Sequence, residues 1–178
     1  MSSTAVPPLT TEGVFSVSTS ILIDAPIETV WSILLDFESY NEWNPFRHVI
    51  IDPITKKPLP SQTLQEGQLV LAEPVHIPPT MGEVGIMQKG SAYVKCFVLD
   101  TVNYRMAWTS GGSVPGFLLH PERWDFLTVT SEGKTKYESV EVVKGILAYP
   151  LRFLMSANLK LGFDAMADAL KVRAEELV

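Results

Sequence analysis

The sequence predicts an α+β fold in which a curved antiparallel β-sheet wraps around a long C-terminal helix, with two short helices after the first strand. Three features of the 178-residue chain lead to this prediction. Residues 15–24 alternate apolar and polar side chains, as a strand with one solvated face does. Residues 47–143 contain short segments rich in β-branched and aromatic residues, separated by turn-forming loops. Residues 146–178 place apolar side chains at the three- and four-residue spacings of an amphipathic helix.

The length of the chain favours one domain, because two full hydrophobic cores rarely fit in 178 residues. Residues 1–14 are predicted to be a disordered N-terminal tail and residues 15–178 a single domain. The tail has neither a basic segment nor an apolar one, so a signal peptide is not predicted. No apolar run reaches the ~18 residues that cross a bilayer. We therefore expect a cytoplasmic protein.

Charge and cysteine content exclude several classes of function. The net charge is −6, with acids and bases interspersed, which disfavours nucleic acid and anionic membranes as partners. The single cysteine, Cys96, cannot form an internal disulfide. No spacing among the three histidines is typical of a metal site, and no glycine-rich phosphate-binding motif occurs, so neither a metal nor a cofactor is expected.

The first strand is followed by two short helical segments and then by β-structure. Residues 27–35 keep helical spacing, and residues 39–46 predict one further helical turn ending at Asn44-Pro45. Short connections between the later strands favour antiparallel hairpins. The predicted strands cover residues 47–52, 68–77, 82–88, 92–100, 104–110, 122–130 and 134–143.

The last helix needs a partner for its apolar face. Its polar face carries Lys160, Asp164, Asp168, Lys171 and Glu175. Its apolar face carries Leu151, Met155, Leu159, Gly162, Met166 and Ala169. A curved sheet that grips this helix covers the apolar face, and an unfilled gap between sheet and helix would form a ligand cavity.

Several short motifs resemble a known superfamily. They include Asp24-Ala25-Pro26, Val30-Trp31, Asp36-Phe37 and Trp43-Asn44-Pro45-Phe46, with further matches at residues 104–108, 114–116 and 162–174. Together they resemble the START/Bet v 1-like (SRPBCC) superfamily, in particular its polyketide cyclase/dehydrase-like or coenzyme-Q-binding-like branch. The resemblance implies a helix-grip fold with a cavity for a small hydrophobic ligand. It does not decide the activity, because fold does not determine function.

Glu141 is the first candidate for chemistry. In the predicted strand 134–143, the face that carries Thr135, Tyr137 and Glu141 matches the inward positions of the family. A carboxylate facing an apolar cavity has a raised pKa and can transfer a proton. The alternative is a structural carboxylate paired with Arg123 or Arg152.

Other polar and aromatic residues are further candidates. His48 follows the second helix near the expected cavity mouth and can act as a base near neutral pH, or it can be a surface or hydrogen-bonded histidine. Tyr137 can assist Glu141, while Asn158 can orient a carbonyl or join the helix to a loop. The residues predicted to bind the ligand are Trp43, Asn44, Tyr93, Phe97, Trp108, Trp124, Phe126, Leu154 and Asn158.

Three functions compete at this stage. The first is a cofactor-free enzyme that drives cyclisation, dehydration or isomerisation of a polyketide-, terpenoid- or lipid-like molecule by proton transfer. The second is a carrier of a lipid, sterol or quinone, which needs the same cavity without an acid or base. The third is an interaction module with a closed core. The inward polar residues favour the enzyme, because unpaired polar groups in an apolar pocket are costly. We expect a monomer or a homodimer.

Overall fold

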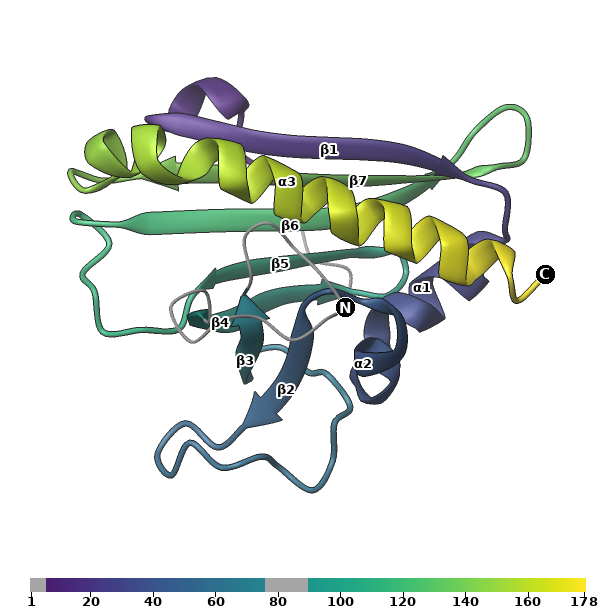
Figure 1. The fold of residues 1–178 in the computed structure, drawn as a ribbon, viewed down its shortest axis with the longest axis horizontal. Coiled ribbons are helices and arrows are strands. Elements are labelled where there is room, and N and C mark those ends of the chain that lie inside the picture. The colour runs from purple at the N-terminus through teal and green to yellow at the C-terminus, as the bar shows by residue number, and fades with distance from the viewer. Residues whose placement is uncertain (1–5, 76–89) are drawn as a thin grey trace.

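A seven-stranded antiparallel sheet and a long C-terminal helix make up most of the computed structural model, which describes residues 6–75 and 90–178 (Figure 1). The spatial order of the strands is β1-β7-β6-β5-β4-β3-β2, so the first strand pairs with the last. The strands are β1 (Phe15–Ile23), β2 (Arg47–Ile51), β3 (Leu69–Val75), β4 (Gly90–Asp100), β5 (Arg105–Ser110), β6 (His120–Val129) and β7 (Thr135–Lys144). The predicted α+β helix-grip architecture is confirmed.

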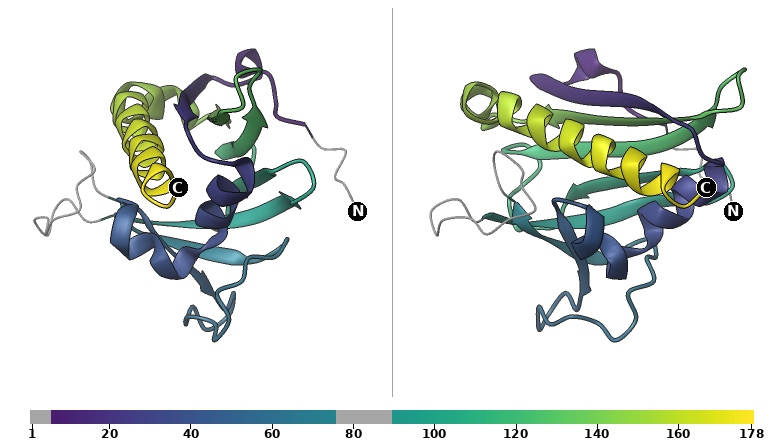
Figure 2. Two further views of the ribbon diagram at one scale, coloured as in Figure 1. Left: turned by 90° about the vertical axis from the view of Figure 1, so that its right-hand side faces the viewer. Right: turned by 45° about the vertical axis from the view of Figure 1, so that its right-hand side comes forward.

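The helices also occupy the predicted places. Helix α1 (Ile27–Leu35) follows β1, and a 3₁₀ turn (Phe37–Ser39) leads into α2 (Tyr40–Trp43). Helix α3 (Ala148–Glu175) runs along the sheet and packs mainly on β1, and the sheet curves around it (Figure 2). The strand predicted at residues 82–88 lies outside the described residues.

The segment that precedes β1 joins the domain. A 3₁₀ turn (Thr10–Glu12) packs against β7, and the backbone N–H of Val14 donates to the carbonyl of Val143 at 2.9 Å. Lys144 also pairs with Glu12 at 3.1 Å. A disordered tail was predicted for residues 1–14. Residues 10–14 instead contact the sheet, and residues 1–5 lie outside the described part of the chain.

The two faces of the sheet have separate apolar clusters. The main core lies on the inner face, where α1, α2 and the second half of α3 meet the sheet. On the opposite face, Trp124 is fully buried beside Val98 and Ala107, with Phe97 and Phe126 packed around it. Only the inner face borders the cavity described below.

Helix α3 is buried unevenly along its length. From Gly162 onward it buries Phe163, Met166 and Leu170 against the sheet and α1. Its first turns instead leave large apolar side chains such as Phe153 exposed. The predicted apolar face is covered along most of its length: Leu151 and Leu159 are partly buried against the cluster around Phe163, whereas Met155 stays exposed. No helix within the described residues has the length and apolarity needed to cross a membrane.

Candidate active site: a cavity between the sheet and the last helix

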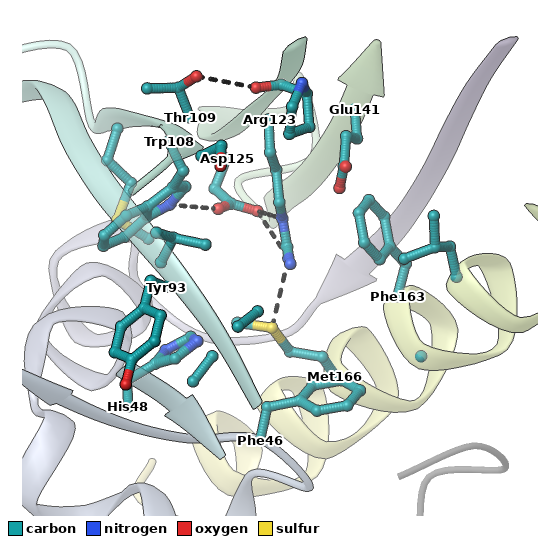
Figure 3. Close-up of a pocket in the computed structure, with 18 of the residues that line it drawn as sticks. Phe46, His48, Tyr93, Trp108, Thr109, Arg123, Asp125, Glu141, Phe163 and Met166 are labelled. Atoms are coloured by element: carbon teal, nitrogen blue, oxygen red, sulfur yellow. Dashed lines mark hydrogen bonds and ion pairs between the residues drawn. The ribbon is translucent and has the colours of Figure 1, made fainter. Parts of the chain in front are cut away.

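A cavity of about 270 Å³ lies between the inner face of the sheet and α3 (Figure 3). Its lining comes from α2, from the segment that enters β2, from β2 to β7 and from the middle of α3. Most of the lining side chains are apolar, including Phe46, Met106, Phe163 and Met166. The charged side chains Arg123, Asp125 and Glu141 lie on the wall formed by β6 and β7 (Figure 3). Such a cavity suits a small hydrophobic molecule with one polar end.

Arg123 and Asp125 form the charged centre of that wall. They are two residues apart on β6, so both side chains point to the inner face. The Nη2 of Arg123 lies 3.2 Å from Oδ1 of Asp125, and Asp125 is almost completely buried. The Arg123 Nε also donates to the Ser139 hydroxyl at 3.1 Å. The Phe163 ring lies 4.1 Å from the guanidinium carbon and covers the cation from the helix side.

Two further donors hold the Asp125 carboxylate. The indole N–H of Trp108 donates to Oδ2 at 3.0 Å, and the Tyr137 hydroxyl donates to Oδ1 at 2.8 Å. Burial lowers the pKa of Arg123, but the nearby charges of Asp125, Tyr137 and Glu141 together outweigh it, so the net pKa is raised and the arginine stays charged. Burial, with the charge of Asp125, also raises the pKa of Tyr137 above its ordinary value. A fixed cation therefore faces the cavity.

Glu141 faces the same cavity from the neighbouring strand. It pairs in register with Arg123 across β6 and β7 and is partly buried. No hydrogen bond or ion pair joins its carboxylate to any residue within 6–75 and 90–178; Arg123 is engaged by Asp125 instead, and Arg152 is exposed on α3. Burial raises the pKa of Glu141, and the charge of Asp125 adds to this while that of Arg123 opposes it. An unpaired carboxyl with a raised pKa can exchange a proton with a ligand.

His48 stands on the opposite wall of the cavity, on β2 (Figure 3). Its ring packs against Phe37, Tyr40 and Trp108, with ring centres 5.4, 5.1 and 6.2 Å away. The Nδ1 atom is buried without a hydrogen-bond partner among the described residues. Burial, helped by the charge of Arg123, lowers the pKa of His48 to about 4. The imidazole is therefore neutral at physiological pH and can accept a proton or a hydrogen bond from a ligand.

The structure brings five of the predicted site residues to the cavity and places seven elsewhere. Glu141, His48, Tyr93, Trp108 and Asn158 line the cavity. Tyr137 is fully buried in the main core beside the cavity, and its hydroxyl donates to Asp125. Trp43 and Asn44 are buried in the region of α2, outside the lining.

Three of the predicted aromatic residues belong to the other face of the sheet. Trp124 and Phe126 alternate with Arg123 and Asp125 along β6, and Phe97 packs on Trp124 with ring centres 6.0 Å apart. Because neighbouring residues of a strand point to opposite faces, the charged pair takes the cavity side and the aromatic pair the far side. Leu154 also lies outside the lining, since it is 71% exposed on an uncovered turn of α3.

Arg123 and Asp125 are the functional candidates that sequence reasoning did not select. The available signal was the alternation in residues 123–126, where two charged residues share one face and two aromatic residues share the other. Sequence alone favours burial of the aromatic face in a single core. The sheet instead buries both faces, and the charged face is the one that meets the cavity.

A metal centre has no support in the described residues. No group of three or more histidine, cysteine or acidic side chains within them is placed to hold a metal ion. The described polar groups of the cavity bind one another or remain available to an organic ligand.

Comparison with known proteins agrees with this architecture. The family described as "Polyketide cyclase / dehydrase and lipid transport" matches residues 14–77, roughly a third of the chain. This segment holds β1, α1, α2, β2 and β3. No curated protein matches the chain significantly.

Solved structures share the fold over nearly the whole chain. A START superfamily protein from Mycobacterium smegmatis is 18% identical, with a TM-score of 0.60, and the match covers 92% of this chain and 99% of that one. The ZhuI aromatase/cyclase from Streptomyces sp. R1128 is 15% identical, with a TM-score of 0.64 and coverage of 90% and 93%. Ara h 8.0201 is 13% identical, with a TM-score of 0.64 and coverage of 92% and 99%. These structures share the fold that the predicted resemblance to the START/Bet v 1-like superfamily implies, and at these identities the likeness shows the fold alone.

Proposed function

We propose that the protein binds a small hydrophobic molecule in the cavity and catalyses a cofactor-free proton transfer on it. The observation that carries the proposal is Glu141, a partly buried carboxyl that faces the cavity without a partner among the described residues. A protein that only needed an apolar container would gain stability by placing an apolar residue there. The polyketide-cyclase description of the matching family and the aromatase/cyclase among the similar folds support the same reaction class.

Arg123 and Glu141 divide the proposed work. The fixed guanidinium of Arg123 binds a carbonyl oxygen of the ligand and stabilises negative charge that develops on it. The Glu141 carboxylate takes a proton from the carbon next to that carbonyl. An enolate forms, and its oxygen stays bound to Arg123. The proton then returns from Glu141 to another atom of the ligand or to a departing hydroxyl. These steps give isomerisation, cyclisation or dehydration without a redox cofactor.

His48 and Asn158 fit a supporting role. The neutral imidazole on the opposite wall accepts a hydrogen bond from a hydroxyl at the far end of the ligand. Asn158, on α3, offers an amide that donates to or accepts from the ligand. The apolar lining between these groups holds the carbon skeleton in a folded shape.

A carrier function is the second candidate. The cavity is lined mainly by apolar side chains, and the matching family also includes lipid transport in its description. In that case the Arg123–Asp125 pair would bind a polar head group, and Glu141 would not exchange protons with the ligand carbon.

Two linked measurements separate the candidates. Native mass spectrometry after incubation with a small-molecule extract of the source organism identifies the bound compound. Incubation of that compound with the protein in D₂O then reports proton transfer as deuterium incorporation at carbon. We expect fast incorporation with the natural protein and at least about a hundredfold slower incorporation with Glu141→Gln, which keeps the shape but removes the base.

Three other outcomes would contradict the enzymatic proposal or the role of Glu141. Bound ligand that gains no deuterium with either protein is a carried molecule, and the enzymatic proposal fails. Equal incorporation with both proteins rejects Glu141 as the base. Absence of any bound compound would support a closed interaction module.

A further inference from the structure

The first turns of α3 present large apolar side chains to solvent instead of burying them. Phe153 is 86% exposed and Leu154 71%, and Phe117 in the loop before β6 is 69% exposed. We refer to this group as the helix-start patch. It consists of Phe117, Ile146, Leu147, Tyr149, Phe153 and Leu154. Contiguous exposed apolar surface of this kind marks an interaction site on a soluble domain.

Backbone contacts fix the two parts of the patch together. The N–H of Ile146 donates to the carbonyl of Phe117 at 3.2 Å, and that of Leu147 donates to Leu118 at 2.8 Å. Gly145 makes this approach possible, because it has φ +104° and a Cβ there would lie 2.5 Å from the Leu118 carbonyl oxygen. The helix-start patch is thus one surface, in which α3 and the loop before β6 are held together by backbone hydrogen bonds.

The patch is continuous with the cavity along α3. Leu154 lies one helical turn before Asn158, which lines the cavity, and residues four apart share a helix face. Whatever covers the patch therefore sits beside the wall of the ligand cavity.

The charge of this segment differs from that of the whole chain. The chain has a net charge of −6, yet residues 145–159 contain no Asp or Glu and one base, Arg152. Arg152 is exposed and has no ion-pair partner in the described ranges 6–75 and 90–178. Lys144 and Lys160 flank the segment and pair with Glu12 and Asp164 at its edges. Apolar and aromatic residues around an unpaired arginine, without a carboxylate, fit a surface that offers both hydrocarbon and phosphate.

We propose that the helix-start patch docks on the surface of a phospholipid bilayer. Phe153 and Leu154 enter the boundary between head groups and acyl chains, and Arg152 binds lipid phosphate. Docking would place the cavity next to the bilayer, where hydrophobic ligands are dissolved. The overall charge that disfavours anionic membranes is an average over the chain, whereas docking depends on the local surface.

A second copy of the chain fits this patch less well. A two-fold dimer places the same patch on both sides of the interface. That arrangement buries two Arg152 side chains close together with no carboxylate in either patch, which is unfavourable. A bilayer satisfies the arginine without this repulsion.

Co-sedimentation with phosphatidylcholine vesicles that contain phosphatidylglycerol tests the proposal directly. We expect the natural protein to bind them, and the double variant Phe153→Ser/Leu154→Ser to partition at least about tenfold less. Arg152→Glu should reduce binding about tenfold on these vesicles and less on pure phosphatidylcholine. All of these side chains are exposed, so circular dichroism should show an unchanged fold.

Matched controls come from surfaces away from the patch. Val172→Ser replaces an exposed apolar residue near the C-terminal end of α3, and Lys57→Glu reverses an exposed charge in the loop between β2 and β3. Both should bind vesicles like the natural protein. Glu141→Gln should also bind normally, so vesicle docking can be judged separately from the proposed catalysis. A natural protein that does not bind vesicles, or a serine double variant that binds them unchanged, overturns the proposal. A dimer that the same double variant dissociates, seen by light scattering, would assign the patch to self-association instead.

Discussion

Tyr137 donates its hydroxyl to Asp125 Oδ1 at 2.8 Å, and the tyrosine lies in the main core beside the cavity rather than in the cavity lining. The tyrosine is fully buried, so its hydroxyl positions the carboxylate that in turn holds Arg123. Tyr137 thus acts as a positioning residue in the structure, although it shares the inward face of β7 with Glu141.

The first prediction concerns this hydrogen bond. Tyr137→Phe should lower the free energy of unfolding by about 1–3 kcal/mol, because a buried carboxylate loses one of its donors while the ring volume is kept. Urea denaturation at neutral pH measures the change. Tyr93→Phe is the matched control, since Tyr93 is partly exposed and its hydroxyl makes no hydrogen bond among the described residues. Equal losses for the two variants would show that the Tyr137–Asp125 contact contributes nothing specific.

The second prediction concerns the charge pair itself. Asp125→Asn should destabilise the protein by about 3 kcal/mol, because it leaves the mostly buried Arg123 cation without its counter-charge. The double variant Arg123→Met/Asp125→Asn should recover part of this loss, since the unpaired cation is gone. Glu138→Gln removes the partner of Lys136 in a more exposed pair and should cost less than about 1 kcal/mol. A double variant that is as unstable as the sum of its two single variants would argue against coupling.

The order of the elements could be predicted because each has its own local periodicity. Strand β1 keeps strict alternation, and α1 and α3 keep helical spacing, so their bounds lie within a few residues of the predicted ones. The inward face of β7 was also predictable, since Tyr137, Ser139 and Glu141 are spaced two residues apart and share one face of the strand. The local pattern is enough to predict an element when one of its faces is buried and the other is solvated.

The composition of the cavity wall could not be predicted in the same way. Strand β6 is buried on both faces, so the aromatic residues Trp124 and Phe126 do not mark the inner one. The sequence also does not reveal that Arg123 and Asp125 neutralise each other, because the assignment of a face depends on packing between distant strands. Helix α3 shows a further limit: Leu154 was predicted to bind the ligand, but its side chain is exposed to solvent.

The third prediction is a pH dependence caused by His48. Its pKa is about 4 in the folded protein and about 6.5 in an unfolded chain, so the unfolded state binds more protons between these values. The stability contributed by neutral His48 is complete above pH 6.5 and is lost as the pH falls toward 4. The loss over this window is on the order of 3 kcal/mol.

Unfolding free energies measured between pH 7 and 4 test this effect of His48. His48→Gln should flatten the dependence in that window, whereas His120→Gln, at an exposed position, should leave it unchanged. An identical pH profile in the natural protein and His48→Gln would reject the assignment to this residue.

The fourth prediction concerns Glu141, whose contribution to stability changes with pH in the opposite direction to that of His48. Because the pKa of Glu141 is raised in the folded protein, the folded state binds more protons above the ordinary pKa of glutamate, and ionised Glu141 opposes folding at neutral pH. Glu141→Gln should therefore raise the free energy of unfolding at pH 7 by about 1 kcal/mol, the usual gain when a functional group is replaced by a neutral one. The gain should disappear as the pH is lowered through the range where the carboxyl becomes protonated. A destabilised variant at pH 7 would indicate that the carboxylate has a stabilising partner.

The last prediction concerns the floor of the cavity at Gly162. A Cβ at this position would lie 2.9 Å from Cζ of Phe46, and both residues line the cavity. Gly162→Val must push the Phe46 ring into the open space, since the helix backbone cannot move away from the sheet. Binding of an apolar fluorescent probe, 8-anilinonaphthalene-1-sulfonate, should weaken by about tenfold while the helical content stays unchanged. The control is Gly112→Val, in a loop where a Cβ meets only the Ser110 hydroxyl at 3.6 Å. If both valine variants bind the probe as the natural protein does, the probe does not enter this cavity, and a ligand of similar size would have to bind elsewhere.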